Sequence, residues 1–255
     1  MFHFQKVIFL ITTPFSIVAN FILTLLIISK SPPQMGNYKH LLIGVSVFEI
    51  FYAVLDFVSE TTVLSIKRSF AVVVPYEERF FGKEIAMILN CAYCAFSGFS
   101  LGMFVIIFAY RYFVATGSIL LQKFEGIKIL TWFSFPISYA IICFLLDWIP
   151  LSSSPEMDTV VRDAMLNELN TTLDKVVYTG PLIFSTHDNS LQFTAFLTFV
   201  LQSVLTTTSF ALIIFFGLRC YLSIGKLVDH TDLRSVGLKQ IQKQLFVALV
   251  FQVGE

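Results

Sequence analysis

Apolar residues in this chain are gathered into long runs that polar segments separate. The run at 7–29 carries no charged residue between Lys6 and Lys30. An α-helix rises about 1.5 Å per residue, so roughly 20 apolar residues cross a hydrocarbon core of about 30 Å. The runs that approach or exceed this length are 7–29, 41–58, 85–110, 129–149 and 191–218. We therefore predict an all-α, polytopic membrane helix bundle with five full spans.

The remaining segments predict one incomplete helix and two long connections. A sixth apolar pattern at 236–253 predicts the start of a further span, which the end of the chain at Glu255 interrupts. Residues 59–84 and 150–190 are predicted to be loops on the outer side of the membrane. In the longer loop, apolar residues at near-helical spacing favour either a short amphipathic helix or a loosely ordered connector. These residues are Val161, Met165, Leu169, Leu173 and Val177.

Composition agrees with a membrane protein and narrows the function classes. Hydrophobic residues make up 56% of the chain and charged residues 13%, whereas a soluble domain is about 45–50% apolar and about 25% charged. The formal net charge is zero, so no overall positive field favours nucleic acid as a partner. Neither a metal-ligand set nor a cofactor-binding loop is evident in the sequence.

Charge distribution predicts which end of the bundle faces the cytosol. With the N-terminus outside, the inner loops hold more Lys and Arg than the outer segments, as the positive-inside rule requires. The triplet Asn170-Thr171-Thr172 is an N-glycosylation acceptor, and it falls in the loop that this rule places outside. We expect a multi-pass plasma-membrane protein with an extracellular N-terminus.

Several polar residues interrupt the apolar runs and are candidates for function. Glu49 lies well inside the second span, where an ionisable group costs about 2.5–3.5 kcal/mol and needs a partner. Asn20 lies at a similar depth in the first span, so we predict a hydrogen-bonded Asn20–Glu49 pair, acting either as a switch or as a structural clamp. Asp56 and Asp147 lie near the outer ends of their spans, and we expect them to face an outward vestibule.

Patterns that could suggest an enzyme or a disulfide have simpler explanations. Gly98-Phe99-Ser100-Leu101-Gly102 matches a nucleophile-elbow pattern, but it lies within a predicted span that contains no histidine base. Small residues in a membrane helix are typical of close helix packing. The cysteines, Cys91, Cys94, Cys143 and Cys220, lie in or beside spans, so none can tie the long loop to the third span. We predict packing roles for them and no enzyme activity.

Tyr110-Arg111-Tyr112 closes the third predicted span on its cytosolic side. Taken alone, this triplet is compatible with an arginine that snorkels to the lipid headgroups between two interfacial tyrosines.

Four motifs together resemble one family. They are Met35-Gly36-Asn37-Tyr38-Lys39 in the first inner loop, Phe48-Glu49-Ile50 in the second span, Phe108-Ala109-Tyr110-Arg111-Tyr112-Phe113 at the end of the third, and Gln240-Ile241-Gln242-Lys243-Gln244-Leu245-Phe246 before the sixth. On these motifs the chain is similar to nematode seven-transmembrane chemoreceptors of the Str (serpentine receptor class r) group, which includes odorant receptors resembling the diacetyl receptor.

The resemblance implies a rhodopsin-like serpentine fold and a G-protein-coupled olfactory receptor in a sensory-neuron membrane, with the cilium as its site. It implies a small organic odorant bound from outside and a heterotrimeric G protein inside. Tyr110, Arg111 and Tyr112 would then form the G-protein-coupling segment. The acidic residue usual before the arginine is replaced by Tyr110, so an ion pair between these neighbours is not expected.

The sequence departs from the family pattern at its end, which favours a truncated receptor form that does not signal. Two other classes stay open: a small transporter or channel-like protein using Glu49 as an ion site, and a non-signalling partner that forms oligomers with full-length receptors.

Overall fold

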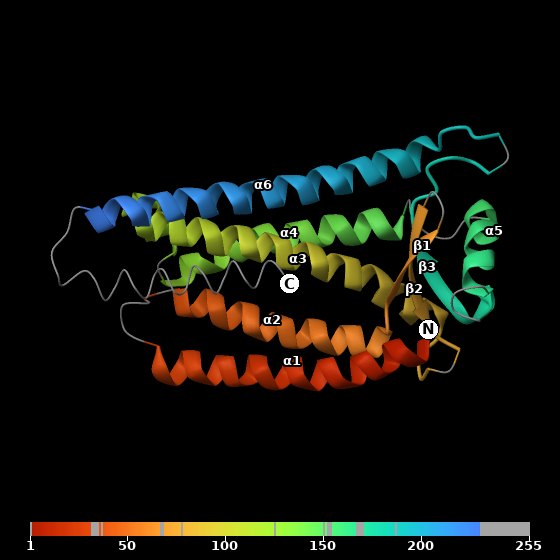
Figure 1. Cartoon of the computed structure of the whole chain (residues 1–255), viewed down its shortest axis with the longest axis horizontal. Helices are drawn as coiled ribbons and strands as arrows, with labels where there is room; N and C mark the ends of the chain where they lie inside the picture. The colour runs from red at the N-terminus through yellow and green to blue at the C-terminus, as the bar shows by residue number, and fades with distance from the viewer. Residues whose placement is uncertain are drawn as a thin grey trace.

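The computed structural model describes residues 2–31, 36, 38–66, 69–77, 79–124, 126–149, 151, 155–166, 171–186 and 188–229; of 2–6, 127 and 224–229 only the backbone is described. Long helices lie side by side, and a small sheet and a short helix cover one end of them (Figure 1). We call this the sheet end; the N-terminus lies there too (Figure 1).

Five helices are long and apolar enough to span a membrane, which confirms the predicted bundle. They are α1 (Phe2–Lys30), α2 (Tyr38–Ser59), α3 (Lys83–Thr116), α4 (Ile129–Trp148) and α6 (Phe193–Asp229). The main difference is at α3, which continues past the predicted end at Tyr110 and stops at Gly117, a glycine with φ 61°. Positive φ is accessible to glycine at little cost, so the helix ends there. The predicted helix at 236–253 lies outside the described residues.

Helix α3 is the central helix of the bundle. Half of its most apolar window is buried, compared with 11–22% in the other four spans. Small residues allow α4 to approach it closely: a Cβ added at Gly98 would lie 2.8 Å from Cys143 Sγ, and one at Gly102 would lie 2.8 Å from Pro136 Cα. Gly98 and Gly102 therefore serve helix packing, as predicted, and not a catalytic turn.

The connections at the sheet end form an antiparallel three-stranded sheet, which corrects the all-α prediction for these segments. β1 (Thr62–Ile66) and β2 (Ser69–Pro75) form a hairpin within the predicted loop 59–84, and β3 (Val176–Thr179) comes from the loop 150–190. β2 is the central strand, with Val72 opposite Thr179 and Val73 opposite Tyr178. The run Ala71-Val72-Val73-Val74 is rich in β-branched residues, which favour strands. It is much shorter than the apolar runs that predict the helices, so the sequence alone did not identify it as a strand.

The two faces of the sheet have different neighbours. Val73, Val176 and Tyr178 pack with the short helix α5 (Pro155–Ala164), whereas Val74 and Val177 pack toward the start of α3. This division follows from the alternation of side chains along a strand. The short helix considered for the long loop is confirmed at Val161, which lies in α5, and Met165 follows in a π-helical turn; both are buried. Leu173 lies in a 3-10 turn and Val177 in β3, whereas Leu169 lies outside the described residues.

Replacing Gly102 with Ala should destabilise the bundle. The new methyl group would meet the backbone of α4 at Pro136, which cannot rotate away, and overpacking of this kind costs about 1–3 kcal/mol. Thermal unfolding of the purified protein in lipid nanodiscs would measure the loss. Gly82→Ala is the matched control, because a Cβ at Gly82 meets nothing within 4 Å. Equal stability of the two variants would contradict this account of α3 packing.

Candidate functional site

Arg111 is buried at the end of the bundle opposite the sheet, with only 4% of its surface exposed. Its Nε donates a hydrogen bond of 2.8 Å to the Tyr38 hydroxyl, and its guanidinium carbon lies 5.0 Å from the centre of the Tyr38 ring. Nη1 is buried without a hydrogen-bond partner among the described residues. The side chain therefore does not snorkel outward, because Tyr38 at the start of α2 holds it inside the bundle.

An aromatic cluster closes around this arginine. The Tyr110 ring stacks on Tyr38 at 5.3 Å and meets Phe124 edge-on at 5.0 Å. Phe124, which is fully buried, stacks on Trp132 of α4 at 4.2 Å. The Tyr112 side chain extends from α3 toward α6, where its ring lies 5.8 Å from that of Phe216. Of the predicted coupling triplet, Tyr110 and Arg111 thus lie in one cluster, whereas Tyr112 contacts α6.

Asn20 and Glu49 have other partners than the predicted ones. The Asn20 side-chain amide donates to the Ser16 carbonyl oxygen on its own helix at 3.1 Å. Glu49 Oε1 accepts a long hydrogen bond of 3.5 Å from Ser100 of α3. Within the described residues, the hydrogen bonds of both side chains run to these neighbours. Equal depth in the membrane did not make them partners, because depth fixes position along a helix but not the direction in which a side chain points.

Glu49 and Asp56 instead share a polar cavity between α1, α2 and α3, which we call the α1–α2 cavity. Its volume is about 240 Å³. The two carboxyls are seven residues apart, which is two helical turns and places them on one face of α2. The rest of the lining is Thr12, Thr13, Ser16, Tyr52, Ala53 and Tyr93, which includes no basic side chain.

Asp147 does not lie in that cavity, so the prediction of one vestibule for Asp56 and Asp147 is not met. Asp147 is 3% exposed, and its carboxyl group interacts with Cys94 of α3 and Gln202 of α6. It therefore joins three helices in the bundle interior instead of facing outward.

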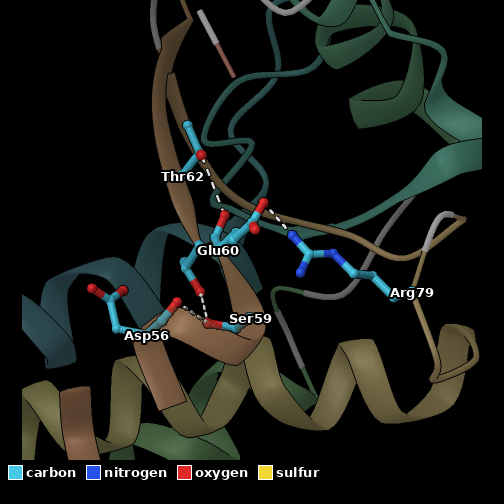
Figure 2. Close-up of polar contacts among 6 residues, drawn as sticks. Asp56, Ser59, Glu60, Thr62 and Arg79 are labelled. Atoms are coloured by element: carbon cyan, nitrogen blue, oxygen red, sulfur yellow. Dashed lines mark hydrogen bonds and ion pairs between the residues drawn. The ribbon is translucent and has the colours of Figure 1, made fainter. Parts of the chain in front are cut away.

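The C-terminal end of α2 is fixed to the segment after β2 by an ion pair. Glu60, with φ 45°, turns the chain out of the helix, and its carboxylate pairs with Arg79. Figure 2 shows this pair together with Ser59 and Thr62, and shows Asp56 pointing away from it. The ion pair thus orients the hairpin above the bundle, while Asp56 is left to the α1–α2 cavity.

A larger cavity of about 730 Å³ lies at the sheet end, and we call it the sheet-end cavity. One wall comes from the first turns of α3, with Met87 and Ile88; another comes from β3, with Val176, Val177 and Tyr178. Trp148 at the end of α4 and Leu173 add apolar surface. The charged lining residues are Lys83, Glu84, Asp158, Arg162 and Asp174. Ligand sites usually measure about 300–1,000 Å³, so this cavity, with apolar walls and several charged residues, is large enough for a small organic molecule.

Asn90 links the two walls of this cavity. It is fully buried, and its side-chain amide nitrogen donates to the Val72 carbonyl oxygen at 3.0 Å and to Thr179 Oγ1 at 3.2 Å. Asn90 was not among the predicted site residues, although an amide within an apolar run was a signal that could have identified it. Tyr38 was named only as part of the motif in the first inner loop, without its contact to Arg111. Asn170, the predicted glycosylation site, lies outside the described residues.

Comparison with known proteins identifies relatives along nearly the whole chain. The sequence model of the serpentine type 7TM GPCR chemoreceptor Str family matches residues 5–254. The chain is 62% identical to the G-protein coupled receptor str-217 of Caenorhabditis elegans over 252 residues, which are 99% of this chain and 73% of that protein. It is 26% identical to serpentine receptor class r-10 of Caenorhabditis briggsae over 241 residues, which are 91% of this chain and 67% of the relative.

Replacing Tyr38 with Phe should lower the free energy of unfolding by about 1–3 kcal/mol, because the buried guanidinium of Arg111 loses its hydrogen-bond acceptor. Thermal unfolding in nanodiscs is the measurement. Tyr112→Phe removes the same atom from a neighbouring tyrosine whose hydroxyl has no hydrogen bond among those of the described residues, so it should change stability little. A loss of stability of similar size in both variants would show that the hydrogen bond between Tyr38 and Arg111 is not the cause.

Proposed function

This chain belongs to the serpentine seven-transmembrane chemoreceptor family Str, and on that premise we propose that it binds a small organic odorant in the sheet-end cavity. It is a multi-pass membrane protein of the G-protein-coupled chemosensory class. Binding at the sheet end would be communicated to a heterotrimeric G protein at the Arg111 end.

The sheet-end cavity carries this proposal. At about 730 Å³ it is roughly three times the volume of the α1–α2 cavity, and apolar side chains from α3, α4 and β3 wall it. Burial of apolar surface supplies about 25 cal/mol per Å², which is the main source of affinity for a small, weakly polar compound. Charged residues on the lining would orient a ligand that also carries a polar group.

The Arg111 end of the bundle supports the proposal that a heterotrimeric G protein binds there. Arg111 lies at the family position that the resemblance assigns to G-protein coupling, and the described structure holds it inside the bundle through Tyr38. A buried guanidinium with an unpartnered Nη1 is a group that gains hydrogen bonds when a partner reaches it. We propose that coupling requires Arg111 to leave Tyr38.

We further propose that the sheet end is extracellular and that the protein resides in the plasma membrane of a sensory cilium. The N-terminus lies at the sheet end (Figure 1). Lys30, Lys39, Lys123 and Lys128 belong to segments at the Arg111 end, in agreement with the positive-inside rule.

Filling the sheet-end cavity should abolish ligand binding. Met87→Trp places a bulky ring in the cavity, whereas Ile85→Trp adds the same ring to an exposed position two residues away that does not line the cavity. Single compounds, namely butanone, hexanol, isoamyl acetate and butyric acid, would be tested for thermal stabilisation of the protein in nanodiscs. We expect at least one to stabilise the wild type and Ile85→Trp but not Met87→Trp. Stabilisation that survives in Met87→Trp would place the ligand elsewhere.

The proposed orientation predicts a single N-linked glycan on protein made in eukaryotic cells. Asn170-Thr171-Thr172 is the one acceptor triplet in the sequence. A glycosidase should therefore increase the gel mobility of the wild type, and Asn170→Gln should remove this shift while Asn167→Gln retains it. The proposed orientation would be wrong if the protein reached the cell surface without a glycan and with an N-terminus that added antibody could not reach.

A further inference from the structure

A single amide side chain holds together the two strands and the helix that surround the sheet-end cavity. The Asn90 amide nitrogen contacts the carbonyl oxygen of Val72 and the hydroxyl of Thr179, and these two residues are direct partners in the β2–β3 register. All three residues are buried, with exposed fractions of 0%, 7% and 1%. Two loops that are about 100 residues apart in sequence therefore meet at one position of α3.

The position of this contact relates it to the cavity. Val176, Val177 and Tyr178 line the cavity and directly precede Thr179. Met87 and Ile88 line the opposite wall and lie three and two residues before Asn90, within one helical turn. Just beyond Thr179, Gly180 lies against the Phe70 carbonyl, where a Cβ would be 2.3 Å from that oxygen. β3 is thus held at its C-terminal end and borders the cavity along the rest of its length.

The chain has no cysteine that could replace this contact with a covalent bond. The four cysteines are free, and the loop residues 150–190 contain none. Asn90 thus connects α3 to β3 through a hydrogen bond to Thr179 and not through a covalent bond. Hydrogen bonds can shift or break within an intact fold, whereas a disulfide would fix the spacing permanently.

We propose that Asn90 is a positioning residue that transmits occupancy of the sheet-end cavity to the far end of α3. This inference rests on the proposed ligand site. A molecule that enters between β3 and the first turns of α3 displaces Thr179 relative to Asn90, and α3 responds as a packed rod. Tyr110 lies 20 residues further along the same helix, about 30 Å away, within the aromatic cluster around Arg111.

Two tryptophans make this proposal measurable, because the sequence contains only Trp132 and Trp148. Trp148 lines the sheet-end cavity, and Trp132 stacks on Phe124 at the Arg111 end. Protein labelled with 5-fluorotryptophan should therefore give two ¹⁹F resonances, one from each end of the bundle. Trp132→Phe assigns them.

The first measurement needs no ligand. Thr179→Val keeps the side-chain shape but removes the acceptor of the Asn90 amide, and Thr179→Ser keeps a hydroxyl. We expect Thr179→Val to shift both ¹⁹F resonances, and Thr179→Ser to resemble the wild type. A purely local structural role would move the Trp148 resonance alone, and this result would overturn the proposal.

The second measurement adds butanone, hexanol, isoamyl acetate or butyric acid singly. In the wild type an active compound should shift both resonances; in Thr179→Val and Asn90→Leu it should still shift Trp148 but lose its effect on Trp132. An undiminished Trp132 shift in these variants contradicts transmission through Asn90. If no compound moves Trp148 in the wild type, the proposed ligand site fails, while the ligand-free comparison still decides the role of Asn90.

Discussion

Hydrocarbon offers no hydrogen-bond partner to a peptide group, and this constraint governs the whole structure. Inside the membrane each backbone amide must bond within its own segment, so the apolar runs are helices. The three-stranded sheet has two edge strands, β1 and β3, and it lies beyond the helix ends (Figure 1). Backbone groups on an edge strand lack a strand partner, which is tolerated outside the hydrocarbon but not within it. Side chains follow the same rule: Asn20 donates to its own helix, and Arg111 is bonded to Tyr38.

Helix α3 connects everything that bears on function. Its first turns form a wall of the sheet-end cavity, its middle packs closely on α4 through Gly98 and Gly102, and its last turns carry Arg111. Because this helix is the most buried of the five, its neighbours restrain it along its full length. Close packing of this kind transmits strain along the helix.

Arg111 has no acidic residue beside it in the sequence, and its buried guanidinium is stabilised in another way. In place of an ion pair, the guanidinium has a tyrosine hydroxyl and an aromatic ring from α2. A neutral acceptor leaves the positive charge uncompensated, so the bond is weaker than a buried ion pair and easier to exchange for another partner. Cys220 of α6 lies close enough to interact with the same charge, which brings a third helix to this position.

The sequence by itself determined the five spans, the packing role of Gly98 and Gly102, and the family, because run length and local motifs depend on neighbouring residues in the chain. The tertiary structure decided the pairing of side chains from different helices: Arg111 with Tyr38, Glu49 with Ser100, and Asn90 with Thr179. It also decided that two loops combine into one sheet. Such contacts depend on how each helix is rotated about its axis, and depth in the membrane carries no information on rotation.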